Sequence, residues 1–225
     1  EVGAFRFART GLSDGEARSA FGAERVLVNT VHTWSSETWL GEPGEHRDLT
    51  VRIVVDRERD RVVGGEVWGH EGVPRRIDIL AAAVVEGWSP GQLSTLDIAY
   101  TPAIGPALDP LNAAGSVAEQ VMADEAFLVD AEALAVKLAR GEPLFLVDVS
   151  KSDRNRALWP AGTPRIPLEE LRERSGELPR NMPIVVLSNT GRRGHLATRI
   201  LRQRGFTDVH NLDGGAMSWR LIAAN

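Results

Sequence analysis

The stretch Ile184-Val185-Val186-Leu187, followed by Ser188-Asn189-Thr190-Gly191-Arg192-Arg193 and a helical pattern over 195–204, decides the fold of the second half of the chain. Four consecutive apolar residues bounded by polar ones are typical of a strand buried on both faces, as in a parallel sheet. Residues 144–149 and 209–212 have the same character. Because these short strands alternate with helical segments, residues 128–225 are predicted to form an α/β domain with a parallel sheet.

The six residues after this strand form a candidate anion-binding loop. Such a loop can turn its backbone N–H groups inward, beneath the positive end of the following helix. The side chain at the first position is then expected to point into this cradle, and the two arginines to add positive charge at its rim. The predicted loop residues are Ser188, Asn189, Thr190, Gly191, Arg192 and Arg193. The alternative for the arginines is an ordinary solvated helix start.

The first half of the chain contains one clear hairpin. Residues 49–55 and 62–68 are strand-like, and the charged residues between them are predicted to form the turn. The pair Gly64-Gly65 indicates a bulge or a close approach of the backbone. Helices are predicted after Ser13, where Glu16 completes a capping box, and over 77–88 and 111–121.

A change of pattern separates the two halves of the chain. Residues 123–127 carry little periodicity and are predicted to form a linker. The predicted domains are therefore 1–122 and 128–225.

The composition excludes several classes of function. Lys and Arg number 26 against 31 Asp and Glu, so the net charge is −5 and no nucleic-acid-binding surface is expected. The chain contains no cysteine, which excludes disulfides, Cys-ligated metal sites and thiol catalysis within it. The histidines lack metal-ligand spacing, so no metal is expected. No apolar run reaches the ~18 residues of a membrane span and no signal peptide is recognised, so a cytoplasmic protein without a membrane partner is expected.

Residues 128–225 resemble a rhodanese domain. The matching stretches are Leu146-Val147-Asp148-Val149, Ile166-Pro167-Leu168-Glu169-Glu170-Leu171, and 205–215 with Trp219. In that family the first loop residue is a cysteine that carries a persulfide, and Asp148 matches the family's aspartate. Here Ser188 takes the cysteine position, and Ser150 stands where the family usually has arginine. Because a serine hydroxyl cannot form a persulfide, the resemblance implies a domain that binds an anionic or thiol-bearing ligand without transferring sulfur.

Residues 1–122 resemble the dimerisation domain of FAD-dependent pyridine nucleotide–disulfide oxidoreductases, in the branch of CoA-disulfide and CoA-persulfide reductases. The matching stretches are Thr10-Gly11-Leu12, 62–69, 76–81, Leu96-Asp97-Ile98-Ala99-Tyr100-Thr101-Pro102 and 109–115. The resemblance implies an α+β domain with an antiparallel sheet that forms a homodimer. It also implies that Tyr100 orients the substrate in the partner subunit, with Trp39 as a loosely aligned second aromatic. The alternative for Tyr100 is a half-buried aromatic that anchors its loop.

Cofactors and substrate are implied only for the parent enzyme. The chain lacks a strand–Gly-x-Gly-x-x-Gly–helix fingerprint, so FAD and NAD(P)H are not expected to bind to it alone. The chain starts at Glu1, which suggests a fragment or a processed product. We therefore interpret it as the C-terminal region of a reductase that acts on a CoA-type thiol or disulfide. The alternatives are a stand-alone, non-catalytic interaction protein and, more weakly, a hydrolase with Ser188 as nucleophile.

Overall fold

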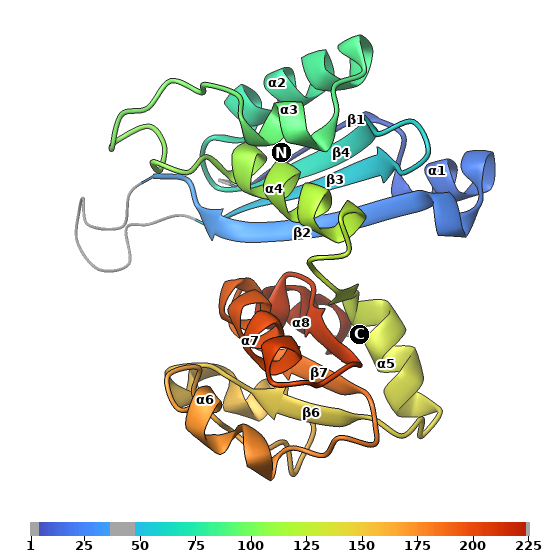
Figure 1. Cartoon of the computed structure of the whole chain (residues 1–225). Helices are drawn as coiled ribbons and strands as arrows, with labels where there is room; N and C mark the ends of the chain where they lie inside the picture. Colours follow the sequence, from blue (N-terminus) through green and yellow to red (C-terminus); the bar gives the residue numbers. More distant parts are fainter. Residues whose placement is uncertain (1–4, 37–47, 224–225) are drawn as a thin grey trace. The chain divides into compact units, whose positions relative to one another are not determined.

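The computed structural model describes residues 5–36 and 48–223 (Figure 1). The chain divides into two compact units, Glu1–Met122 and Ala123–Asn225. Trp39 lies outside the described residues.

The N-terminal unit is an antiparallel sheet with helices. Its four strands have the order β1-β4-β3-β2. The strands are β1 (Arg6–Gly11), β2 (Val26–Trp34), β3 (Asp48–Asp56) and β4 (Arg61–Gly69). The helices are α1 (Asp14–Phe21), the 3-10 turn Ala23–Arg25, α2 (Val73–Glu86), α3 (Pro90–Ser94) and α4 (Pro110–Met122). The expected hairpin and its bulge are confirmed, because β3 pairs with β4 and the register shifts between Val54 and Val55, opposite Gly64.

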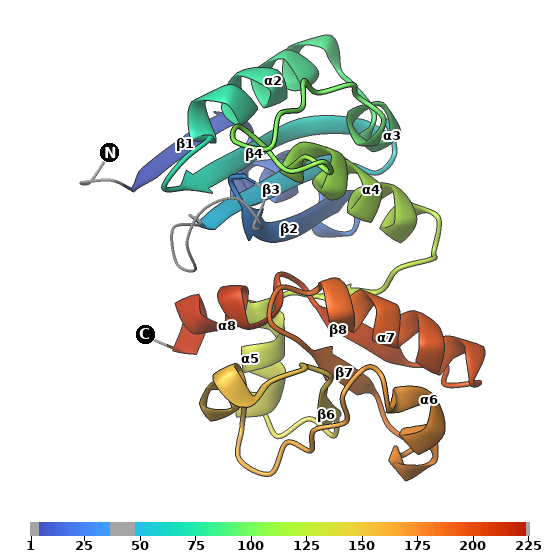
Figure 2. The same ribbon diagram turned by 90° about the vertical axis from the view of Figure 1, so that its left-hand side faces the viewer.

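Different helices cover the two faces of this sheet. Helix α2 packs on β4 and β1, and α4 packs on β2 and β3, over the fully buried side chains of Val51, Ile53 and Val67 (Figure 2). Helix α1 packs on the other face, where Ala17 and Val54 belong to a small buried cluster. The capping box expected at the start of α1 is confirmed, with the Ser13 side chain accepting from the N–H of Glu16.

The C-terminal unit is a parallel sheet between two layers of helices. The strands β5 (Leu128–Val129), β6 (Phe145–Asp148), β7 (Ile184–Leu187) and β8 (Val209–Leu212) have the order β5-β8-β7-β6, and all pairs are parallel. The helices are α5 (Ala131–Ala139), η2 (Asp153–Leu158), α6 (Leu171–Arg174), η3 (Ser175–Glu177), α7 (Arg192–Gln203) and α8 (Gly215–Ala223). This arrangement confirms the predicted α/β fold.

Alternate residues of the strands fill the two layers of the core. Val147 and Val186 face a cluster with side chains of α6 and α7. Leu146 and Val185 face a second cluster with side chains of α5 and α8. Burial on both faces is the reason that these strands have continuous apolar sequences. In the described part of the chain, no helix has the length and apolar character to cross a membrane.

One buried histidine of the N-terminal unit has a lowered pKa. His32 on β2 is 8% exposed, and its Nδ1 lies 2.6 Å from the hydroxyl oxygen of Thr50. Burial, with a smaller effect of the Arg52 charge, lowers the pKa of His32 from 6.5 to about 4. The folded chain therefore binds this proton less readily than the unfolded chain does.

We predict that this difference costs stability as the pH falls from about 6.5 toward 4. The shift corresponds to about 3 kcal/mol of unfolding free energy, which is present in full above the unfolded pKa and is lost at lower pH, where the unfolded chain binds the proton and the folded chain does not. Urea unfolding at neutral and acid pH is expected to show a smaller acid loss for His32→Gln than for the wild type. His70→Gln, at a partly buried position after β4, is the control. Equal pH dependence of His32→Gln and the wild type would contradict the prediction.

Candidate functional site

Ser188 lies at the carboxyl end of β7, where the chain leaves the sheet and enters the loop before α7. Its side chain is 1% exposed. The hydroxyl oxygen accepts hydrogen bonds from the N–H groups of Gly191 and Gly194, each at 3.2 Å. The side chain therefore points into the loop, among the backbone N–H groups that precede and begin α7.

Among the described residues, several other N–H groups of the loop lack a hydrogen-bond acceptor. Within the described residues, this holds for the backbone N–H groups of Asn189, Thr190, Arg192 and Arg193. Helix α7 has twelve residues, and its positive end lies at this loop. Unpaired N–H groups at a helix N-terminus favour an anion. The loop therefore has the N–H donors that an anion-binding site around the serine hydroxyl requires.

The start of α8 is hydrogen-bonded to the backbone of the Ser188 loop. The N–H of Ala216 donates to the carbonyl of Ser188 at 2.8 Å, and the N–H of Met217 donates to that of Asn189 at 3.3 Å. Gly215 has a φ of 59°, and a Cβ at this position would lie 2.3 Å from the Ser188 carbonyl oxygen. Glycine is therefore required where α8 meets the loop.

The two arginines of the loop have different surroundings. Arg193 donates to the carbonyl of Val149 at 3.0 Å and forms an ion pair with Glu169 at 2.5 Å. The hydrogen bond from Arg193 holds the pKa of Glu169 below its usual value. Arg193 thus ties the end of β6 to the loop, and its charge is paired with that of Glu169. Arg192 is exposed, and no partner for its side chain is found among the described residues.

Asp148 and Ser150 shape the chain after β6. Asp148 is buried and accepts the N–H of Ser150 at 2.9 Å. Ser150 is buried too, and its hydroxyl has no hydrogen-bond partner within the described residues.

Two further polar residues reach the loop from distant parts of the sequence. The side-chain amide of Asn155, in η2, donates to the side-chain oxygen of Asn189 at 2.5 Å. Arg220 of α8 donates to Asn155 at 2.8 Å. Neither contact has a local signal in the sequence, because the partners are 34 and 65 positions apart.

Among the described residues, no general base is hydrogen-bonded to Ser188. In that part of the chain its hydroxyl is hydrogen-bonded to N–H groups alone, and to neither a histidine nor a carboxylate. His195, the histidine nearest in sequence, is partly buried on α7. Burial and the nearby Arg199 lower its pKa. A serine nucleophile needs a base to take its proton, so the hydrolase alternative gains no support from this geometry.

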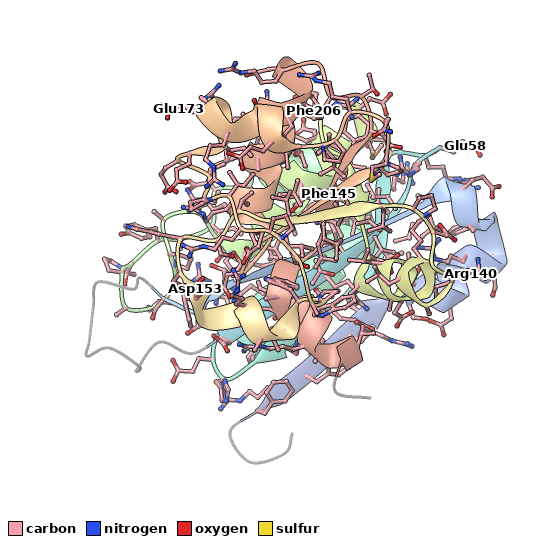
Figure 3. The ribbon with its side chains drawn as sticks, turned by 90° about the horizontal axis from the view of Figure 1, so that it is seen from below. Glu58, Arg140, Phe145, Asp153, Glu173 and Phe206 are labelled. Atoms are coloured by element: carbon pink, nitrogen blue, oxygen red, sulfur yellow. The ribbon has the colours of Figure 1, made fainter. Side chains whose placement is uncertain are left out.

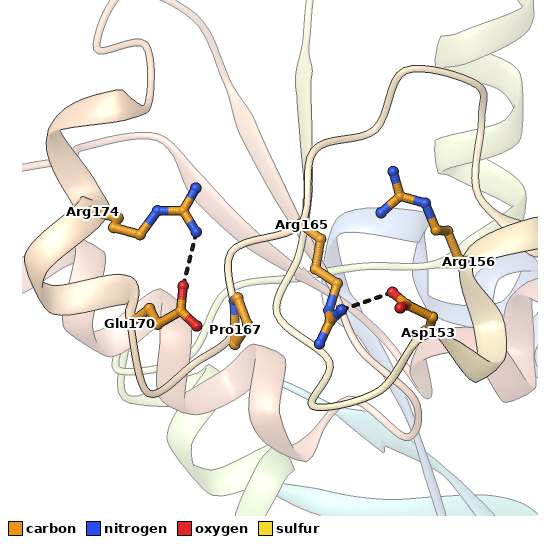
Figure 4. A pocket seen from close by; sticks show the side chains of 6 residues that line it. All are labelled: Asp153, Arg156, Arg165, Pro167, Glu170 and Arg174. Atoms are coloured by element: carbon orange, nitrogen blue, oxygen red, sulfur yellow. Dashed lines mark hydrogen bonds and ion pairs between the residues drawn. The ribbon is translucent and has the colours of Figure 1, made fainter.

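A pocket of about 490 Å³ opens beside the segment that follows β6 (Figure 4). It is lined by Asp153, Arg156, Arg165, Pro167, Glu170 and Arg174. Arg165 pairs with Asp153, and Arg174 pairs with Glu170 and Glu177. Figure 3 labels Asp153, which lines this pocket, and Phe145, which packs against the core cluster shared with α6 and α7. Because two of its three arginines are paired with carboxylates, the pocket has a mixed charge.

Tyr100 belongs to the N-terminal unit and lies in the loop between α3 and α4. Its side chain is 50% exposed. Ile104 and Leu108 of the same loop are 56% and 64% exposed. Among the described residues, no group of three acidic or histidine side chains could hold a metal ion.

Each unit matches a family model. Residues 2–111 match the dimerisation domain of the pyridine nucleotide-disulphide oxidoreductases, and residues 130–221 match the rhodanese-like domain. A curated relative, the NAD(P)H sulfur oxidoreductase (CoA-dependent) of Pyrococcus furiosus, is 37% identical over 103 residues, which are 46% of this chain and 22% of that protein.

Two solved structures resemble the chain over nearly its whole length. Reduced CoADR-RHD from Bacillus anthracis matches 100% of the chain with a TM-score of 0.89, at 24% identity and over 39% of its own length. A NAD-dependent persulfide reductase from A. fulgidus matches 97% of the chain with a TM-score of 0.82, at 29% identity and over 38% of its own length. The two units therefore match, in this order, the dimerisation domain of the pyridine nucleotide-disulphide oxidoreductases and the rhodanese-like domain.

Proposed function

We propose that these residues act as the C-terminal region of an FAD-dependent NAD(P)H CoA-disulfide or CoA-persulfide reductase. The observation that carries the proposal is the match of both units, in one order, to a persulfide reductase of 29% identity over 97% of the chain. In this proposal the N-terminal unit forms the homodimer, and the rhodanese-like unit supplies a second, non-transferring binding site.

The flavin and the nicotinamide would be held by other parts of such a reductase. The described residues do not fit a dinucleotide site, since Gly64 and Gly65 lie within the antiparallel strand β4. Gly214 and Gly215 follow β8, but Gly215 packs directly on the Ser188 loop. A dinucleotide fingerprint requires a glycine turn open to the pyrophosphate between a strand and a helix.

Tyr100 is proposed to contribute to a site in the other subunit. The phenol is both a hydrogen-bond donor and an acceptor, and its ring offers an apolar face to a thiol or disulfide. Its exposure on a loop supports a role in contact with another molecule. The proposed substrate is a CoA-type thiol, disulfide or persulfide.

The rhodanese-like unit is proposed to bind without transferring sulfur. The unpaired N–H groups around Ser188 favour a small anion or the anionic end of a larger ligand. The hydroxyl of Ser188 has no base within hydrogen-bond distance among the described residues, and an oxygen nucleophile cannot become a persulfide.

Dimerisation is tested by sedimentation of the chain at tens of micromolar, where a homodimer is expected. Leu108→Arg places a charge on the exposed loop of the N-terminal unit, and it is expected to shift the chain toward the monomer. Val136→Arg, at a similarly exposed position on α5, is the matched control and is expected to leave the dimer intact. A strictly monomeric wild-type chain would contradict the proposal.

Binding without transfer is tested by titrating isotope-labelled chain with thiosulfate. Chemical shifts of the backbone N–H groups of Asn189, Thr190, Arg192 and Arg193 are expected to change, while mass spectrometry shows no added sulfur. Ser188→Asp is the control, since its own carboxylate would occupy these N–H groups and abolish the response. Covalent loading of the wild type with sulfur, or unchanged shifts, would refute this part of the proposal.

A further inference from the structure

The loop that carries Tyr100 projects from the N-terminal unit between α3 and α4 (Figure 1). Its first part is held by Asn112, a buried residue of α4. The side-chain amide of Asn112 donates to the carbonyl oxygens of Leu93, Ser94 and Leu96 at 3.0, 3.3 and 2.9 Å. Asn112 therefore holds the start of the loop against α4, the helix that follows the loop.

Two neighbouring arginines of α2 hold the rest of the loop. Arg75 donates through Nη2 to the carbonyl of Ala99, in the peptide group that joins Ala99 to Tyr100. Arg76 is fully buried and donates to one carboxylate oxygen of Asp109 through Nε and Nη2, at 3.1 and 2.8 Å. Asp109 in turn accepts the N–H of Leu111 at 3.0 Å, in the first turn of α4. The two ties lie on either side of residues 100–108.

The middle of the loop also lies against these arginines. A Cβ added at Gly105 would lie 3.1 Å from Nη2 of Arg76 and 3.2 Å from Nη1 of Arg75. Just before this point, a turn is closed by the N–H groups of Ile104 and Gly105, which both donate to the carbonyl of Thr101. The backbone thus passes close to both guanidinium groups.

The outward side of the loop is apolar. Tyr100, Ile104 and Leu108 are each at least half exposed. Fixing a loop in one conformation costs backbone entropy, and exposing large apolar side chains on it gains nothing in water. A loop that is ordered in advance, however, loses less entropy when it enters a binding site.

We propose that Arg75 and Arg76 are positioning residues, which form a two-point clamp that holds the Tyr100 loop in the conformation that enters a second copy of the protein. This inference rests on the proposed function, because it takes the second copy as the target of the loop. Arg75 acts on the backbone next to Tyr100, and Arg76 acts through Asp109 at the base of α4.

Fluorine NMR of the full chain tests the clamp. Tyr100 is the single tyrosine of the 225 residues, so incorporation of fluorotyrosine gives one resonance that reports on this loop. In the wild type, a broad resonance with a shift that depends on protein concentration is expected, because the ring is ordered and passes into the dimer. In Arg75→Gln, we expect a sharper resonance nearer the random-coil position and dimerisation about tenfold weaker, since the loop must be ordered on binding.

Two variants separate positioning from a general loss of fold. Arg75→Lys keeps a charged donor within reach of Ala99 and is expected to restore most of the wild-type linewidth and dimerisation. Arg76→Lys keeps a charge beside the buried Asp109 and tests the second tie without leaving that carboxylate alone. Arg57→Gln removes an exposed arginine from the β3–β4 turn and is the matched control. Circular dichroism verifies the fold of each variant.

The outcomes distinguish the clamp from the proposed function. An Arg75→Gln chain with wild-type linewidth and wild-type dimerisation would overturn the clamp. A sharpened resonance with unchanged dimerisation would overturn entry of the loop into a second copy. A wild type that stays monomeric at every concentration would refute the proposed dimerisation and the second copy as target, whatever the linewidths of the variants show.

Discussion

Side chains that hydrogen-bond to backbone groups hold both loops of functional interest in this chain, since a backbone polar group buried from water needs a partner. In the N-terminal unit, the buried amide of Asn112 donates to the carbonyl of Leu93, and Arg75 donates to the exposed carbonyl of Ala99. In the C-terminal unit, the hydroxyl of Ser188 takes the N–H groups of Gly191 and Gly194. A few side chains therefore determine where each loop lies.

Sequence patterns predicted the strands and helices whose conformation depends on residues close to one another in the chain. The apolar runs of β6, β7 and β8 identified a parallel sheet, because burial on both faces leaves little room for polar residues. Ser13 marked a helix start, since its side chain accepts an N–H of the first turn. Strand β2 was not predicted. It buries polar residues, among them Asn29, which donates to the carbonyl of Ala114 on α4, and such a partner is set by tertiary structure.

The same distinction applies to the candidate site. The position of Ser188 at the start of an inward-turned loop could be predicted, because a strand followed by a short loop and a helix fixes it locally. The ion pair of Arg193 with Glu169 and the contact of Asn155 with Asn189 could not, since each joins segments at least 24 positions apart. The sequence therefore identifies the Ser188 loop as the candidate site, and the structure identifies the distant residues that hold this loop.

The two loops present their key side chains in opposite directions, one inward and one outward. This difference limits the chemistry that the chain can perform alone. Ser188 turns inward and accepts the N–H groups of Gly191 and Gly194, while Tyr100 is exposed on the same loop as Ile104 and Leu108. With no cysteine among the 225 residues, neither loop can meet a thiol of this chain. An outward aromatic on an ordered loop has a chemical role only when another molecule supplies the reacting group. On the proposal made here, the N-terminal unit therefore contributes part of a site whose thiol chemistry lies in other residues of the assembly.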